Sequence, residues 1–393
     1  MTNFIKGNQI HLLRNGIEYF PALEAAIAQA KSSIYLQTYI FAQDAVGVTI
    51  GNALMTAARR GVATHLLIDG FGSKDLPSSF VEMLEEGGVQ VMFYRPKISP
   101  WTFKKNRLRR LHQKVAVIDG IVGFVGGINI IDDFDVPNSV PNNVPPRIDY
   151  AVRIEGPLLT PISANVLKLW RRMAWLRFRL GSTQSPFSMG EHKQPYLPAV
   201  AGDIEAAFVV RDNVLRRRDI EHAYLTAIEH AKTEIVIANA YFVPGYRFRK
   251  ALIAASTRGV KVTLLLQGRL EYFLMLATHA FYSEFLCNGI RIFEYRKSLM
   301  HSKVAVIDGH WATVGSSNLD PFSLLLAREA NVVVNDQQFS AELKASVLAN
   351  IHAGAIQIDP HDWVVGNFFK RTVSKMMIGL MRVLLGLIGK DSQ

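Results

Sequence analysis

Short apolar runs alternate with amphipathic stretches along the whole 393-residue chain. Residues 33–41 and 234–242 are β-rich runs, and a stretch with helical spacing follows each of them. Both predicted helices close at an Arg-Gly pair, where glycine accepts the backbone conformation of a C-cap, and a buried strand comes next in residues 58–70 and 256–268. This alternation predicts βαβ units and a mostly parallel or mixed sheet covered on both faces.

The pattern occurs twice, which predicts a doubled unit. A third matching pair, residues 87–94 and 288–295, again has a glycine that ends a helix before a strand begins. We therefore predict an α/β fold of two pseudo-symmetric halves, each with a mixed central sheet flanked by helices. A Gly-, Ser- and Pro-rich segment marks the boundary. The expected bounds are 1–185 for the first half, 203–355 for the second, 181–202 for the boundary segment and 360–390 for a C-terminal amphipathic segment.

The strongest signal lies at equivalent places in the two halves. The first half contains His112-Gln-Lys114 and the second contains His301-Ser-Lys303. Each pair is followed by the apolar run Val-Ala-Val-Ile, an Asp-Gly pair and a downstream Gly-x-x-Asn. The histidine, lysine, aspartate and asparagine of the second copy all lie 189 positions after their counterparts, as 301 does after 112. One such pair would be incidental, but two in one register indicate a shared chemical purpose.

Residues two apart on a strand point to the same face, so each histidine projects together with its lysine. If the halves meet about a pseudo-two-fold axis, both pairs converge on one pocket that can hold a tetrahedral phosphate. One imidazole then attacks phosphorus and the other protonates the leaving oxygen. The lysines stabilise the non-bridging oxygens without a metal. Further phosphate-binding groups are expected from Asn129, Ser316, Ser317 and Asn318.

A proton-transferring imidazole needs a carboxylate to orient its far nitrogen. Asp149 and Glu329 each open an apolar strand at matching positions, and we expect the pairs Asp149–His112 and Glu329–His301. The motif aspartates, Asp119 and Asp308, are also candidate catalytic residues. For these two, bracing of the turn is favoured over contact with substrate.

Composition and net charge limit the kinds of partner that the protein is expected to bind. Apolar residues make up 49% of the chain and charged residues 20%, as in a folded globular protein. The formal net charge of +11 favours an anionic partner, which is nucleic acid, an anionic bilayer or a phosphorylated small molecule. The single cysteine, Cys287, excludes an internal disulfide and is expected to be buried. The start of the chain lacks the pattern of a secretory signal, and no apolar stretch predicts a membrane-spanning helix.

Three stretches combine aromatic and basic residues and are expected to lie at a bilayer surface. They are residues 101–110, 170–179 and 363–390. For the last stretch, the alternative is a terminal helix that docks on the protein. The residues expected to contact the membrane are Trp101, Phe103, Trp170, Trp175, Phe368 and Phe369.

The duplicated HxKx4DG motif with its downstream Gly-x-x-Asn resembles the signature of the phospholipase D superfamily over residues 8–336. Residues 239–248, 293–296 and 310–321 are similar to bacterial cardiolipin synthases of the B type. The resemblance implies a phosphatidyltransferase without a cofactor, which passes a phosphatidyl group through a phosphohistidine to phosphatidylglycerol and gives cardiolipin and glycerol. It also implies a peripheral protein of the bacterial inner membrane, with an anionic bilayer and phosphatidylglycerol as partners and no nucleic acid.

By the same resemblance His112 is the nucleophile and His301 the acid and base, although the symmetric residue pattern does not order them. Gln37 stands where similar enzymes have an acidic residue, which would alter the polar lining of the pocket. Two alternatives stay open. The first is a phospholipase D-type phosphodiesterase that hydrolyses phospholipid or nucleic acid. The second is a non-catalytic membrane-binding protein, against which two intact motifs argue.

Overall fold

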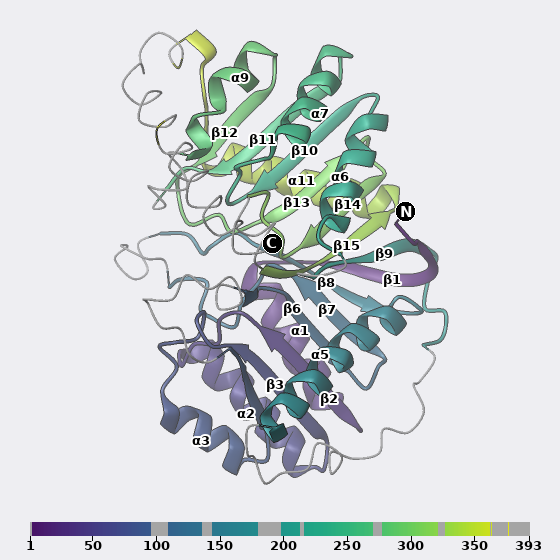
Figure 1. The fold of residues 1–393 in the computed structure, drawn as a ribbon, viewed down its shortest axis with the longest axis vertical. Helices are drawn as coiled ribbons and strands as arrows, with labels where there is room; N and C mark the ends of the chain where they lie inside the picture. Colours follow the sequence, from purple (N-terminus) through teal and green to yellow (C-terminus); the bar gives the residue numbers. More distant parts are fainter. Residues whose placement is uncertain are drawn as a thin grey trace.

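The computed structural model describes residues 2–95, 109–135, 144–179, 198–212, 216–269, 277–320 and 327–361, together with residues 363 and 376. Two α/β halves lie one above the other along the long axis of the molecule (Figure 1). The elements of the first half are β1 (Ile5–Arg14), α1 (Asn15–Gln29), β2 (Ser33–Thr38), α2 (Ala45–Arg59), β3 (Ala63–Asp69), α3 (Ser78–Glu86), β4 (Gln90–Tyr94), β5 (Arg110–Leu111), β6 (Lys114–Ile118), β7 (Val122–Gly126), β8 (Tyr150–Glu155) and α5 (Leu159–Arg179).

The second half repeats this order, except that β5 has no counterpart among its described strands and β16 follows its last helix. Its elements are β9 (Ile204–Arg211), α6 (Asp219–His230), β10 (Glu234–Asn239), α7 (Tyr246–Thr257), β11 (Lys261–Gln267), α9 (Tyr282–Cys287), β12 (Arg291–Tyr295), β13 (Lys303–Ile307), β14 (Trp311–Gly315), β15 (Ala327–Asn335), α11 (Gln337–Gly354) and β16 (Ala355–Gln357).

Each half contains a mixed sheet, as predicted. β2, β3 and β4 are parallel, as are β10, β11 and β12. The motif strands β6 and β13 run antiparallel to β2 and β10. β1 pairs with β8 of its own half and with β9 of the other, so the described strands form one continuous 16-stranded sheet. The α/β fold class is therefore confirmed.

Arg-Gly pairs end two equivalent helices, as expected. Gly61 and Gly259, just beyond α2 and α7, have φ values of +87° and +91°, which glycine adopts without strain. The arginine before each glycine has a second task. Arg60 donates to the Ile27 carbonyl at 3.1 Å, and Arg258 donates to the Ile228 carbonyl at 3.0 Å. Each guanidinium thus binds carbonyls near the C-terminal end of the preceding helix.

Three apolar clusters lie between the layers. One lies between the first sheet and α1–α3, and a second between the other sheet and α6, α7 and α9. The third contains side chains of both halves, including Val115, Val125, Val314 and Val332, together with α5 and α11. This shared cluster joins the two halves, so the edge at which both motifs lie is held by buried apolar contacts from each side.

One of the remaining expectations is wrong, and another concerns residues outside the described ranges. Cys287 is exposed, because it ends the short helix α9 on its outer side, so its predicted burial is wrong. The predicted boundary segment lies largely outside the described residues. At the start of the predicted C-terminal segment, the Trp363 ring lies 5.0 Å from that of His279 and 4.9 Å from that of Tyr282. Among the helices that the structure describes, none has the length and apolar character needed to cross a bilayer.

The motif aspartates brace the turns that follow the motif strands. Asp119 accepts hydrogen bonds from the N–H groups of residues 31–33 and from the hydroxyl of the middle residue. Asp308 makes the same set of contacts with residues 232–234. Both lie at the end of the strand opposite to the histidine. Their placement among the catalytic residues is therefore corrected, and the alternative expectation of a bracing role is the one observed.

Replacing Asp308 with alanine is expected to lower the free energy of unfolding by about 1–2 kcal/mol, because three backbone N–H groups and a hydroxyl lose a charged acceptor. Although burial opposes it, hydrogen bonding by residues 232–234 lowers the pKa of Asp308. The stabilisation is therefore present at neutral pH and disappears as the pH falls below about 4. Urea unfolding at several pH values tests this. Asp308→Asn, which keeps an acceptor oxygen, is the control, and loss of catalysis with unchanged stability would contradict the bracing role.

Candidate active site

Each motif histidine stands just before a strand, and each motif lysine begins that strand. β6 starts at Lys114 and β13 at Lys303. The ammonium group of Lys114 donates to the backbone carbonyl of His112 at 2.7 Å, and Lys303 binds the carbonyl of His301 in the same way. Both lysines are buried, with exposed fractions of 3% and 0%. Each lysine is therefore held beside its histidine, as the alternation along a strand predicts.

Each histidine contacts a carboxylate of the opposite half. His112 Nδ1 lies 3.1 Å from Glu329 Oε2, and His301 Nδ1 lies 2.7 Å from Asp149 Oδ2. Both carboxylates are buried. These are the two acids that the sequence predicts, but the predicted pairing within each half is wrong.

Strand pairing between the halves explains the crossing. β5 pairs in parallel with the start of β15, and the His112 N–H donates to the Arg328 carbonyl at 3.0 Å. On the other side, Ile148 forms a parallel bridge with Met300, and the His301 N–H donates to the Ile148 carbonyl at 2.7 Å. The segment before each histidine thus runs beside the segment before the other half's acid. Both acids open equivalent strands, so sequence position alone does not distinguish the two pairings.

The four motif side chains act on one another across the halves. Burial lowers the pKa of His112 against the opposing effect of Glu329, and Lys114 and Lys303 lower it further. Burial also lowers the pKa of His301 well below its ordinary value, with contributions from Lys303, Lys114 and His112. The crossed contacts bring both pairs to the seam between the halves. Both imidazoles are neutral near pH 7, which is the nucleophilic form.

The buried lysines of the two motifs are suited to bind an anion. Burial lowers the pKa of Lys114 to about 7 and that of Lys303 to about 8, because a buried ammonium group loses its hydration. A phosphodiester bound between them favours the protonated form, since an opposite charge nearby stabilises it. The site is therefore suited to an anionic phosphoryl group.

The two carboxylates are supported differently. The buried hydroxyl of Ser316 donates to Glu329 and accepts from the Ala330 N–H at 3.0 Å. The equivalent residue in the first half is Gly127, where a Cβ would lie 2.3 Å from Asp149 Oδ1. A hydroxyl has one proton to donate, and that of Ser316 is committed to Glu329. The prediction that Ser316 donates to phosphate is therefore wrong, because the residue orients a carboxylate instead.

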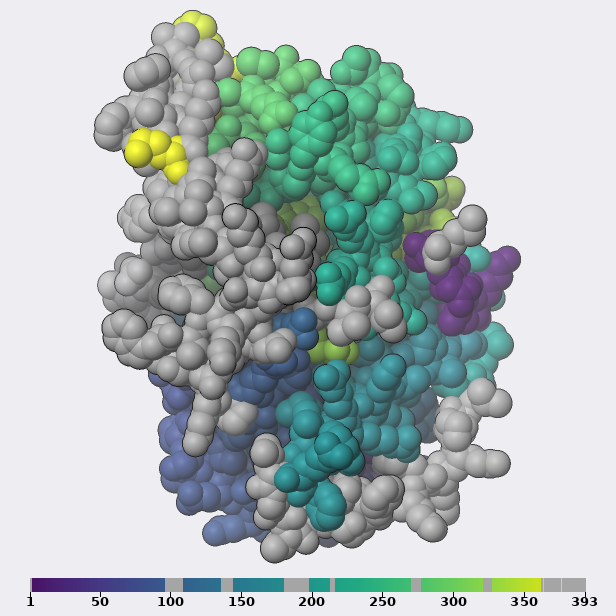
Figure 2. Space-filling model, viewed as in Figure 1, coloured from purple at the N-terminus to yellow at the C-terminus, as the bar shows by residue number. Residues whose placement is uncertain are grey.

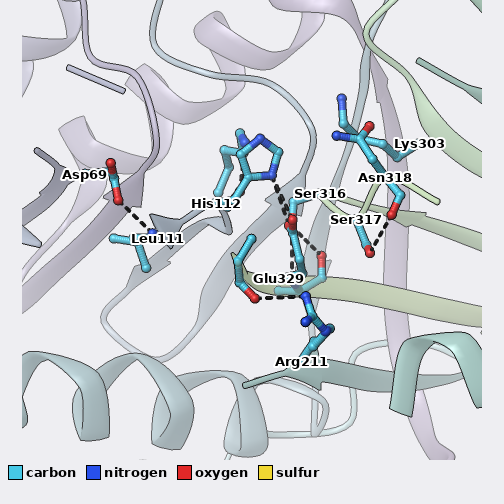
Figure 3. A network of polar contacts seen from close by, with 12 residues as sticks. Asp69, Leu111, His112, Arg211, Lys303, Ser316, Ser317, Asn318 and Glu329 are labelled. Carbon is cyan, nitrogen blue, oxygen red and sulfur yellow. Dashed lines mark hydrogen bonds and ion pairs between the residues drawn. The ribbon is translucent and has the colours of Figure 1, made fainter. Parts of the chain in front are cut away.

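Behind Glu329 lies a buried cation that the motifs do not reveal. Arg211 ends β9, is the cross-strand neighbour of Glu329 and is 1% exposed. Its guanidinium donates to the carbonyls of Arg217 at 3.0 Å and Ala327 at 3.1 Å. Figure 3 shows Arg211 on the side of Glu329 away from His112. Burial lowers the pKa of Arg211 to about 10 and Glu329 raises it, so Arg211 stays protonated at neutral pH and places a positive charge behind Glu329.

The predicted amide and hydroxyl groups lie near the motifs. Asn129 Oδ1 accepts from the Ile40 N–H at 3.1 Å. Asn318 Oδ1 is buried and has no hydrogen-bond partner among the described residues. Figure 3 shows Lys303, Ser317 and Asn318 together beside His112. Binding of phosphate by Asn129, Ser317 and Asn318 stays a prediction.

An aromatic ring that the motifs did not point to packs on the first histidine. The Tyr39 ring lies 4.8 Å from the His112 imidazole, and Lys114 Nζ lies 5.3 Å from its centroid. In the second half Tyr241 is farther from His301, at 6.5 Å. Burial raises the pKa of Tyr39 to about 12, so the ring stays neutral. Tyr39 therefore restricts the orientation of one imidazole more than Tyr241 restricts the other.

Two other expectations concern residues that lie between α5 and the sheet. The Gln37 amide donates to the Val166 carbonyl of α5 at 3.2 Å, and its carbonyl oxygen accepts from the Gln113 amide of the first motif. Its effect on the polar lining of the pocket stays a prediction. Trp170 is 3% exposed, and its ring lies 4.7 Å from that of His65. Its predicted membrane contact is wrong, because this face of α5 covers the sheet.

The other predicted membrane residues divide into two groups. Trp175 is 44% exposed, and the Arg179 guanidinium lies 4.1 Å from its ring centroid. Leu176 and Phe178 beside it are also exposed. Four predicted residues lie outside the part of the chain that the structure describes. They are Trp101, Phe103, Phe368 and Phe369.

A duplicated α/β fold with two crossed histidine–carboxylate pairs and two buried lysines defines a phosphoryl-transfer protein of the phospholipase D type. A family model described as "Cardiolipin synthase, PLD-like domain" matches residues 23–133 and 224–349. The chain belongs to this cardiolipin synthase family, which confirms the resemblance found in the sequence.

Known proteins agree with this assignment. The chain is 37% identical to cardiolipin synthase B of Escherichia coli (strain K12), over 98% of this chain and 90% of that protein. It is 38% identical to cardiolipin synthase B of Salmonella typhimurium, with the same coverage. Among solved structures, phosphatidylserine synthase of Haemophilus influenzae superposes with a TM-score of 0.67 at 13% identity, over 97% of this chain and 95% of that one. This last likeness concerns the fold alone.

Replacing Gly127 with alanine is expected to reduce the catalytic rate about a hundredfold while the protein stays folded, because the new Cβ displaces the Asp149 carboxylate from His301. The rate at saturating substrate and the circular dichroism spectrum test this. Gly245→Ala is the matched control, since a Cβ there meets nothing within 4 Å. Equal rates for both variants would show that the position of Asp149 does not matter.

Proposed function

We propose that this protein makes cardiolipin by transferring a phosphatidyl group from a donor phospholipid, phosphatidylglycerol, to the hydroxyl of a second phosphatidylglycerol, with release of glycerol. The observation that carries the proposal is the pair of imidazoles, each bound through Nδ1 to a buried carboxylate of the opposite half beside a buried lysine. This arrangement leaves each Nε2 for phosphorus or for a proton. The names of the relatives supply the substrate class.

The reaction proceeds in two displacements. Nε2 of His112 bonds to phosphorus and the bond from phosphorus to the oxygen of the headgroup glycerol breaks. His301, whose protonated form is favoured once the anionic phosphodiester binds beside it, gives its Nε2 proton to that oxygen. In the second step His301 takes the proton of the acceptor hydroxyl, whose oxygen bonds to phosphorus as the bond to His112 breaks. Lys114 and Lys303 stabilise the negative charge on the non-bridging oxygens throughout.

Unequal support of the carboxylates favours His112 as the nucleophile. A phosphorylated imidazole carries positive charge, and its partner must remain ionised to stabilise it. Glu329 has Ser316 and Arg211 for that purpose. Asp149 has no equivalent hydroxyl, because the matching position is glycine, and burial raises its pKa to about 6.

Product analysis tests the proposed activity directly. Purified full-length protein is incubated with phosphatidylglycerol vesicles, and thin-layer chromatography separates cardiolipin from phosphatidate. We expect cardiolipin as the main product. Phosphatidate alone would identify a hydrolase of the same superfamily, and cleavage of plasmid DNA in a parallel assay would identify a nuclease.

Trapping the covalent intermediate tests the order of the histidines. With phosphatidylglycerol labelled at phosphorus, we expect His301→Asn to accumulate labelled protein and His112→Asn to remain unlabelled, because only the former keeps the nucleophile. Acid-labile label mapped to a peptide containing residue 112 supports the assignment. Label confined to residue 301 in His112→Asn would reverse the roles.

A lipid substrate requires contact with a bilayer. We propose that the protein binds peripherally to the bacterial inner membrane. The exposed end of α5, at Trp175, Leu176 and Phe178, supports it, since aromatic and basic side chains meet there. Residues 360–390 are the second proposed attachment site. Residues 1–185 and 203–355 are then the two catalytic halves that these segments bring to the lipid.

Replacing Trp175 and Phe178 together with alanine is expected to weaken binding to anionic vesicles about tenfold, because two exposed aromatic rings no longer insert. Co-sedimentation with phosphatidylglycerol vesicles measures it. Ile17→Ala on α1 removes a side chain that is 79% exposed on another part of the first half and serves as control. Equal loss in the control would rule out a specific role for the end of α5.

A further inference from the structure

A cluster of guanidinium groups lies next to the first motif and has no part in the chemistry above. Its five members come from separate segments of the chain, and they are Arg95 after β4, Arg109 before β5, Arg172 on α5, Arg217 after β9 and Arg328 on β15. Burial lowers the pKa of Arg109, and repulsion by Arg95, Arg217 and Arg172 adds to the effect while Tyr94 opposes it. Burial also lowers the pKa of Arg328, with a contribution from Arg172, while Tyr94 and Asp212 raise it. Cationic groups therefore predominate in this cluster.

The cluster adjoins the site without belonging to it. The Arg328 carbonyl accepts from the His112 N–H at 3.0 Å, and Arg109 precedes His112 by three residues. Residues alternate along β15, so Arg328 projects from the face opposite to Glu329. In Figure 2 the segments that begin at residues 109, 216 and 327 meet at the surface along the seam between the halves.

Two of these side chains have unused donors. The Nε atoms of Arg109 and Arg328 are buried and have no hydrogen-bond partner among the described residues. A buried guanidinium donor without an acceptor is unfavourable, and an arginine fork matches the oxygens of a phosphate. Their position at an accessible seam indicates a phosphate-bearing ligand.

Acceptor chemistry identifies that ligand. The attacking hydroxyl of phosphatidylglycerol belongs to a lipid whose own phosphodiester is not consumed, and a short glycerol headgroup separates the two. The motif lysines hold the phosphorus that reacts, so the second phosphate needs another cationic site close to His112. We infer that the arginine cluster binds the unreacted phosphodiester of the acceptor phospholipid, an inference that rests on the proposed transferase function.

The site affects the second displacement alone. The acceptor oxygen bonds to phosphorus, the bond from phosphorus to the imidazole breaks, and the hydroxyl proton passes to the other imidazole. Water and simple alcohols undergo the same step without a second phosphate. The cluster therefore favours a phosphatidylglycerol acceptor over water, which distinguishes a transferase from a hydrolase with the same motifs.

Competition between two acceptors tests this inference. Short-chain, water-soluble phosphatidylglycerol serves as donor and as charged acceptor, and ethanol serves as uncharged acceptor in the same mixture, which removes the bilayer from the experiment. For Arg109→Gln we expect the ratio of cardiolipin to phosphatidylethanol to fall about tenfold, because a charged hydrogen bond to the acceptor phosphate is lost. Arg172→Gln, in an exposed helical position, repeats the test without a change near the motif strand.

Arg247→Gln on α7 is the control, because it removes a positive charge at an exposed position of the second half, and its product ratio should match that of the unaltered protein. An unchanged ratio in both cluster variants, or a parallel loss of both products, would overturn the acceptor site. Failure of the proposed function itself looks different, since the unaltered protein would then form no cardiolipin and would release only phosphatidate or phosphatidylethanol.

Discussion

The crossed contacts between histidines and carboxylates link catalysis to the association of the two halves. A buried carboxylate without a partner is costly, and each half places its acid where the other half's imidazole is the partner. Neither half contains both members of a histidine–carboxylate pair. The shared apolar cluster and the strand pairing through β1 and β9 hold the halves in the one arrangement in which both pairs form. Loss of that arrangement would leave both Asp149 and Glu329 without their imidazole partners.

The two halves share a fold, but the surroundings of their motifs differ chemically. The two motifs share histidine, lysine, aspartate and asparagine in one register, yet the groups that support their carboxylates differ. Glu329 has a serine hydroxyl and a buried arginine behind it, whereas Asp149 lies against glycine. A two-step transfer needs such a difference, because one imidazole must carry phosphorus while the other moves protons. Duplication supplied two similar groups, and the surroundings make them suited to different tasks.

The positively charged side chains become less buried from the reaction centre outward. Burial lowers the pKa values of the two motif lysines, because desolvation disfavours their charged form. A bound anion favours that charged form again. The arginines along the seam are more accessible, since each of them is half-buried or exposed. An enzyme that joins two anionic lipids has to bring two phosphates close together, and two separate cationic sites offset the repulsion between them. The net charge of +11 is therefore partly concentrated where the proposed reaction requires it.

Local order along the chain was enough to predict much of this protein. Alternating strand and helix patterns, Arg-Gly helix ends and a repeated motif predict two α/β halves, and the spacing of His112 and Lys114 predicts their common direction. Contacts between distant segments decided the rest. The crossing of the carboxylates, the burial of Trp170 between α5 and the sheet, and the place of Arg211 behind Glu329 depend on strand register and on the packing of distant segments against one another. Equivalent positions in a repeat look alike in sequence, so only the tertiary structure distinguishes a partner in the same half from one in the other.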